Sequence, residues 1–286
     1  PLKQEHEKEI DSLFNKINAE WIKVTGHKPN KTQMHKTFVK VVDDCKLELP
    51  CGWYLYGKIC VKHFDPAEDY SYSELENEQQ VSTAITSTVL IYSKSKQTFD
   101  LRAMQYEEMH NELYKTRLSL SKLLSASDFG SNLDKINETF YKLMMELPQI
   151  DDSESKEIIS EFAGLISRLI RKTPKEELSE LKTIISIEFE PIWGLIAMHQ
   201  LKNDLSKYYS KEELASSVGL EIEFKKEIIL NELSRLSELL PAEAEPTDAS
   251  YKKLSEIKSA NNAINPADKS KNLIDSSNVF RELGLD

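Results

Sequence analysis

The sequence is poor in glycine and cysteine and contains no long hydrophobic run. Eight glycines among 286 residues leave few positions for tight phosphate-binding or catalytic loops. Neither a glycine-rich phosphate loop nor a Gly-x-Ser-x-Gly nucleophile motif occurs. No apolar stretch approaches the roughly 20 residues that a transmembrane helix needs. We therefore expect a protein that is not an enzyme and that has no membrane partner.

The three cysteines are odd in number and are not spaced as a disulfide framework. This suits a reducing environment, so we expect a cytoplasmic or otherwise intracellular protein. Cys60 and His63 have the spacing of paired zinc ligands, whereas Cys45 and Cys51 do not. A single Glu-x-x-His motif, Glu107–His110, lacks the second copy that a di-iron helical bundle requires. We predict no metal and no cofactor, and a helical metal- or carboxylate-dependent enzyme is the least favoured alternative.

Positive charge is concentrated near the start of the chain, although the net charge of the whole sequence is −11. Residues 21–64 contain eight lysines and three acidic residues, which gives a local net charge of +5. A basic segment attached to an acidic body is typical of a module that binds nucleic acid or an acidic protein surface. The alternative is a scatter of solvated lysines with no common function.

The N-terminal residues predict two helices followed by a strand. Apolar residues spaced three and four apart indicate an amphipathic helix over residues 3–24, ended by Gly26. Thr32 is the expected N-cap of a second helix, which stops before Pro50. Aromatic and β-branched residues at high density over residues 53–64 indicate a half-buried strand. This order of elements is compatible with a winged-helix-like α+β module.

Beyond this module the sequence predicts mainly long helices. The segment 81–92 is compatible with a strand or a helix, and a capping box formed by Ser73 and Glu76 favours the helix. Residues 99–124 carry a heptad-like apolar seam that is interrupted by His110 and Arg117. Such a seam is typical of coiled-coil pairing, so we expect this helix to take part in a bundle or in self-association.

Residues 210–233 have the spacing of two helices joined by a turn near Gly219, preceded by a capping box formed by Ser210 and Glu213. Glutamates along this segment would repel phosphates, so we interpret it as a helix–turn–helix that packs within the fold and not as a DNA-binding motif. The whole pattern predicts a mainly α fold. Its expected parts are a basic N-terminal module (residues 1–68), an acidic helical body with a coiled-coil-like seam (70–240), and a linker with a C-terminal docking segment (241–286).

The entry into the second helix and the predicted strand supply candidate contacts to nucleic acid. Lysines can bind phosphates, and amide side chains such as those of Asn30 and Gln33 can bind base edges. The candidate set is Lys28, Asn30, Lys31, Thr32, Gln33, Lys36, Lys40, Lys58 and Lys62.

A short apolar cluster near the C-terminus is a candidate partner-binding segment, because it follows a polar linker. Its residues are Leu273, Ile274, Val279, Phe280 and Leu283. These features together predict a non-catalytic adaptor or regulator. Its N-terminal module would contact nucleic acid, and its helical body would oligomerise or bind a protein partner. The alternative is a pure protein–protein interaction scaffold, in which the lysines meet an acidic partner surface.

Overall fold

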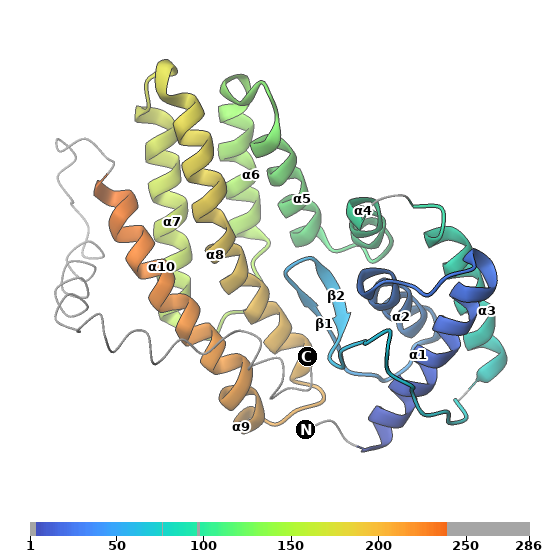
Figure 1. Cartoon of the computed structure of the whole chain (residues 1–286). Helices are drawn as coiled ribbons and strands as arrows, with labels where there is room; N and C mark the ends of the chain where they lie inside the picture. Colours follow the sequence, from blue (N-terminus) through green and yellow to red (C-terminus); the bar gives the residue numbers. More distant parts are fainter. Residues whose placement is uncertain (1–3, 76, 96–97, 239–286) are drawn as a thin grey trace. The chain divides into compact units, whose positions relative to one another are not determined.

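The computed structural model has a mainly helical fold, as predicted, and a small two-stranded sheet (Figure 1). It describes residues 4–75, 77–95 and 98–238. Within these ranges, no helix has both the length and the apolar character needed to cross a membrane.

The described residues form two compact units. Among the described residues, the first unit contains those up to Asn111 together with Gln200–Val218, and the second contains Glu112–His199 together with 219–238. Residues 70–111, which we expected in the helical body, are thus grouped with the N-terminal unit.

The first unit begins with two helices, α1 and α2, that meet along their apolar faces. Its elements in chain order are α1 (Gln4–Thr25), α2 (Lys31–Cys45), β1 (Cys51–Tyr54), β2 (Gly57–Cys60), α3 (Glu78–Tyr92), α4 (Thr98–Glu108), the end of α8 (Leu178–Leu205) and α9 (Lys211–Leu214). The helix expected over residues 3–24 is therefore confirmed as α1.

Helix α2 is capped by Asn30 and not by Thr32, which lies in its first turn. The Asn30 side chain accepts from the Gln33 backbone N–H, and the Gln33 side chain accepts from the Asn30 N–H, both at 2.9 Å. This reciprocal capping box satisfies two donors that the helix cannot pair internally. The Thr32 prediction was wrong because a suitable cap residue precedes it.

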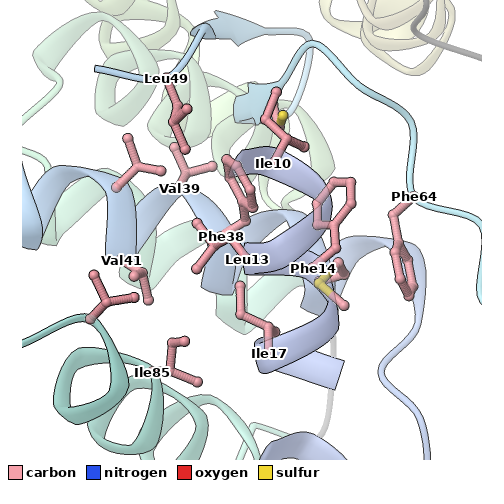
Figure 2. Packing of buried hydrophobic residues seen from close by; sticks show 14 of the residues in the cluster. Ile10, Leu13, Phe14, Ile17, Phe38, Val39, Val41, Leu49, Phe64 and Ile85 are labelled. Atoms are coloured by element: carbon pink, nitrogen blue, oxygen red, sulfur yellow. The ribbon is translucent and has the colours of Figure 1, made fainter. Parts of the chain in front are cut away.

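The core of the first unit lies where α1, α2 and α3 pack together (Figure 2). The Phe14 ring lies 5.0 Å from the ring of Phe38 and 5.4 Å from that of Phe64. Buried α1 residues recur every three or four positions, as one face of an amphipathic helix requires. Figure 2 labels Ile10, Leu13, Phe14, Ile17, Phe38, Val39, Val41, Leu49, Phe64 and Ile85 within this core.

The strand expected over residues 53–64 is instead an antiparallel hairpin. Its strands pair Cys51 with Cys60 and Tyr54 with Gly57. The prediction of a single strand was wrong because a two-residue connection reverses the chain before Gly57.

The segment 81–92 is helical, which confirms the favoured reading of that stretch. It belongs to α3, whose N-cap is Asn77 in the left-handed conformation with a φ of 54°. The expected cap residue Ser73 lies outside the helix, and its hydroxyl donates to the Lys8 carbonyl at 3.2 Å. The predicted capping box was therefore wrong although the helix was right.

The seam expected over residues 99–124 is not one continuous helix. Helix α4 ends at Glu108, His110 adopts a φ of 49°, and α5 begins at Glu112. A non-glycine residue in the left-handed region ends the helical hydrogen-bond ladder. The apolar spacing continues across the break, which is why the sequence pattern concealed it.

The second unit is a set of packed helices with aromatic side chains in its core. Its elements are α5 (Glu112–Ser125), the 3₁₀ turn η1 (Phe129–Asn132), α6 (Leu133–Met145), α7 (Ser153–Lys172), the 3₁₀ turn η2 (Lys175–Glu177), most of α8, and α10 (Leu220–Glu238). The fully buried Trp193 ring lies 4.9 Å from Tyr114 at 79°. The Phe140 and Phe189 rings lie 5.4 Å apart at 89°.

Residues 210–233 do not form two helices joined by a turn. Ser210 and Glu213 form the expected capping box, with hydrogen bonds of 3.2 and 2.8 Å. Helical structure then continues through the π-helical residues Ala215–Gly219 into α10. The helix–turn–helix interpretation was wrong because the chain stays helical through the π-helical segment Ala215–Gly219, with no turn at Gly219.

Candidate binding pocket

Strands β1 and β2 form the β-hairpin of the first unit (Figure 1). This hairpin lines the candidate site through Cys51, Trp53 and Lys58. Leu55 and Tyr56 connect its strands, and Gly57 opens β2 with a φ of 119°. L side chains rarely adopt this conformation. A Cβ atom at Gly57 would also collide with the side chains of Lys36 and Gln105. The tight reversal therefore requires glycine at this position.

A pocket of about 660 Å³ lies beside the hairpin. This volume is in the range of roughly 300–1,000 Å³ that is typical of ligand sites. Its walls come from α1, the end of α2 and the loop after it, both strands, and the segment at the end of α8. The lining residues are His6, Val42, Asp43, Lys46, Leu47, Glu48, Leu49, Cys51, Trp53, Lys58, Asp204, Lys207 and Tyr208.

Asp204 joins the hairpin to the end of α8. One carboxylate oxygen accepts from the Trp53 backbone N–H at 2.7 Å, and the other accepts from the Gln200 amide at 3.0 Å. Burial raises the pKa of Asp204 above its usual value. Gly52 permits this close approach, because a Cβ atom there would lie 3.3 Å from the Asp204 Cβ and closer still to Leu201. Asp204 therefore fixes the position of β1 against the pocket wall.

Charges of both signs surround the pocket. Lys58 on β2 pairs with Asp43 on α2 at 2.5 Å. Lys46 is the C-cap of α2 in the left-handed conformation, with a φ of 55°, a position where glycine is usual. Lys46, Lys207 and Glu48 are exposed, and within the described ranges none of the three forms an ion pair. The pocket thus offers charged groups of each sign to a ligand.

Aromatic surface is also present in the pocket. The Trp53 ring is largely buried and lies 6.0 Å from the Tyr106 ring. The His6 and Tyr208 rings lie 6.0 Å apart and nearly perpendicular, at 86°. Burial raises the pKa of Tyr208, so its phenol keeps the proton that it can donate in a hydrogen bond.

Two of the groups at the pocket, Cys51 and Asp204, have surroundings that limit their reactivity. Burial raises the pKa of the Cys51 thiol, so this side chain is a poor nucleophile at neutral pH. The Asp204 carboxylate already accepts two hydrogen bonds, one from the Trp53 backbone N–H and one from the Gln200 side-chain amide. In the described part of the chain, no group of three or more His, Cys, Asp or Glu side chains is placed to bind a metal ion.

Three of the candidate nucleic-acid lysines form ion pairs inside the first unit. Lys40 pairs with Asp44 at 2.5 Å, Lys58 pairs with Asp43, and Lys62 pairs with Asp11. Lys62 is also within 3.5 Å of Glu7. Part of the positive charge that the sequence concentrates in this region is therefore paired with acidic side chains of the same unit.

Lys36 is buried beneath the hairpin, with 3% of its surface exposed. Its ammonium donates to the Tyr56 carbonyl at 2.9 Å, to the Gln105 side-chain oxygen, and more distantly to the Lys58 carbonyl at 3.5 Å. Burial lowers the pKa of Lys36 to about 7, and the nearby Arg102 contributes in the same direction. Lys36 thus links α2, the hairpin and α4, and it cannot reach a phosphate.

The remaining candidates lie around the start of α2. Asn30 and Gln33 are used in the capping box, and the Lys28 ammonium donates to the Pro66 carbonyl at 2.7 Å. Lys31 is exposed and Thr32 is partly exposed. Of the nine candidate side chains, Lys58 alone also lines the pocket.

The candidate partner-binding residues Leu273, Ile274, Val279, Phe280 and Leu283 lie outside the described residues.

Sequence reasoning missed the pocket residues that lie far along the chain from the hairpin, namely Asp204, Lys207 and Tyr208. Asp204 and its partner Trp53 are 151 residues apart in sequence. No spacing rule links them, and Lys207 and Tyr208 follow a helix whose pattern indicates only core packing. A weak signal was the density of aromatic and glycine residues over 51–57, which indicates close backbone approach.

Comparisons with protein-family models, with curated protein sequences and with solved structures found no match to this chain.

Proposed function

We propose that this chain is a non-catalytic adaptor that binds a protein partner, and that the pocket beside the hairpin receives a peptide segment of that partner. The observation that carries the proposal is the use of the N-terminal lysines inside the fold. Lys36 is buried, and Lys40, Lys58 and Lys62 are paired with acids.

Charge compensation of this kind disfavours nucleic acid as the ligand. Binding to a phosphate backbone depends on cations that displace counterions, and a lysine already paired with a carboxylate contributes little to that exchange. A winged-helix-like DNA-binding domain would also need an exposed recognition helix. Helix α2 instead packs against α1, α3, α4 and β2. These contacts support the protein-binding alternative.

The lining of the pocket is suited to a peptide. Exposed Lys46, Lys207 and Glu48 offer salt bridges of both signs, and Trp53 and Tyr208 add aromatic surface. A peptide presents backbone amides, apolar side chains and charges together, whereas a nucleic acid presents one sign of charge. The compensated charges on the wall select against a ligand of uniform charge.

A random peptide display library screened against the immobilised full-length chain tests the proposal. Selected peptides should bind the wild type and lose at least about tenfold in affinity, or roughly 1.4 kcal/mol, on Lys46→Glu/Lys207→Glu. Lys8→Glu is the matched control, because Lys8 is exposed on α1 and does not line the pocket. Failure to enrich any peptide sensitive to the pocket variant would contradict the proposal.

Nucleic acid is the competing outcome. Fluorescence anisotropy with labelled single-stranded DNA, duplex DNA and RNA at low salt should show no saturable binding tighter than about 10 μM. Tighter binding that falls steeply with salt, and that Lys28→Glu/Lys31→Glu abolishes, would restore the nucleic-acid hypothesis in place of this one.

A further inference from the structure

Two of the three cysteines face each other across the hairpin. The register pairs Cys51 on β1 with Cys60 on β2. The Val61 backbone N–H donates to the Pro50 carbonyl at 3.2 Å, which marks the neighbouring Pro50–Val61 position as hydrogen-bonded. Positions alternate along an antiparallel ladder, so Cys51 and Cys60 occupy a non-hydrogen-bonded position.

This position suits a disulfide. Opposed residues at a non-hydrogen-bonded position have Cα atoms about 4.5 Å apart and side chains on one face of the sheet. Disulfides form at Cα separations of roughly 4.4–6.8 Å. Both thiols are free, and both side chains are buried. The two sulfurs can therefore join without a change of register.

We propose that Cys51 and Cys60 are a redox-active pair, which a peroxide oxidises to an intramolecular disulfide. Cys51 is the thiol that reacts first with the peroxide, because it lines the pocket and is 6% exposed, whereas Cys60 is 1% exposed. The Cys51 thiol loses its proton, and its thiolate attacks one oxygen of hydrogen peroxide. The O–O bond breaks, and the departing hydroxide takes up that proton, so a sulfenic acid and one water are produced. The Cys60 thiol attacks the sulfenic sulfur, the S–S bond forms, and the hydroxyl group leaves with the thiol proton as a second water. The two sulfurs are oxidised by two electrons in total, and the peroxide is reduced to two waters.

The reaction should be slow at neutral pH and confined to this pair. Burial and the neighbouring Cys60 raise the pKa of Cys51, so its thiolate is scarce below pH 9. Cys45 is at the end of α2 and has no cysteine opposite it in the hairpin register. The disulfide would fasten the two strands that carry Trp53 and Lys58, and would thereby fix one wall of the pocket. This inference stands on the hairpin geometry alone and does not depend on the proposed function.

Peptide mapping of the oxidised full-length chain tests the proposal. The native protein is treated with hydrogen peroxide at pH 8, its remaining thiols are blocked, and it is digested with trypsin. Cleavage after Lys46, Lys58 and Lys62 separates the two cysteines, so the expected product is residues 47–58 linked to residues 59–62, with Cys45 recovered as a blocked thiol. The linked product should lose the mass of two hydrogen atoms and be reversed by a dithiol reductant.

The controls separate a preformed pair from random oxidation. Cys45→Ser should give the same linked peptides, whereas Cys60→Ser should leave Cys51 as a sulfenic acid or unreacted. The same treatment in denaturant should mix all three possible pairings. Links to Cys45 in the native protein, covalent dimers as the main product, or two thiols that survive peroxide unchanged would each overturn the proposal.

Discussion

Replacement of Lys36 by methionine should remove a pH dependence from the stability of the first unit. An ordinary lysine has a pKa of 10.5, and burial lowers that of Lys36 to about 7. Between these two values the unfolded chain binds a proton at this side chain that the folded chain does not. Folding therefore releases a proton, and the free energy of unfolding rises with pH across this window.

The expected size follows from the two pKa values. A full shift of this kind corresponds to about 5 kcal/mol, since one pKa unit is about 1.4 kcal/mol. Between pH 7 and pH 8.5 the wild type should gain about 1.5 kcal/mol relative to Lys36→Met. Methionine has a similar length and is apolar, so the variant fills the same space without a titrating group. Its stability at a single pH is less informative, because the loss of the bonds to Tyr56 and Gln105 offsets the relief from burial of a charge.

Urea unfolding followed by tryptophan fluorescence measures the effect. A Trp193→Phe background leaves Trp21 and Trp53, which both belong to the first unit. The comparison stays below pH 8.5, because Cys51 has a raised pKa and weakens the fold as pH rises beyond the unfolded value of 9.0. Parallel pH profiles for wild type and Lys36→Met would refute the reasoning, since they would mean that Lys36 keeps its proton in the fold.

Three further substitutions test the hairpin and the capping of α2 by urea unfolding in the same background. Asp204→Ala should destabilise the first unit by about 1–3 kcal/mol, because the Trp53 N–H loses a charged acceptor, and a loss under 0.5 kcal/mol would show that water replaces it. Gly57→Ala should lower the free energy of unfolding more than Gly26→Ala, since both glycines have positive φ but only at Gly57 would the new Cβ atom collide with neighbours. Equal losses of stability at the two positions would contradict the tight packing of the turn. Asn30→Ala should cost about 1 kcal/mol, and an unchanged midpoint would contradict the capping box.

Much of the helical framework could be predicted from the sequence because it depends on local spacing. The apolar face of α1 and the capping box at Ser210 follow from residues within one or two turns of each other. The break between α4 and α5 could not be predicted, because His110 gives no signal comparable to glycine or proline. The Asn30-x-x-Gln33 spacing did contain the correct cap of α2, but Thr32 offered an equally plausible one.

The candidate site was less accessible to sequence reasoning, because its groups act in pairs across long separations. Composition shows that residues 21–64 are basic, but it does not show which acids meet those lysines. Lys62 forms an ion pair with Asp11, which lies 51 residues earlier in the sequence. Lys36 donates a hydrogen bond to Gln105, which lies 69 residues later. Contacts at this range depend on the packing of α1, α2 and α4, which brings part of the basic segment against acceptors from distant parts of the sequence.

Quantitative amine labelling tests the central claim, that the fold uses these lysines internally. The native full-length chain is treated with a limiting amount of an acetylating reagent, and the rate at each lysine is measured by mass spectrometry after digestion with a protease that does not cleave at lysine. We expect Lys36 to be protected, Lys62 to react slowly, and Lys31 and Lys46 to react rapidly, because the first is buried, the second is paired with Asp11, and the last two are exposed. Labelling of Lys36 and Lys62 at the rate of Lys31 would contradict the account.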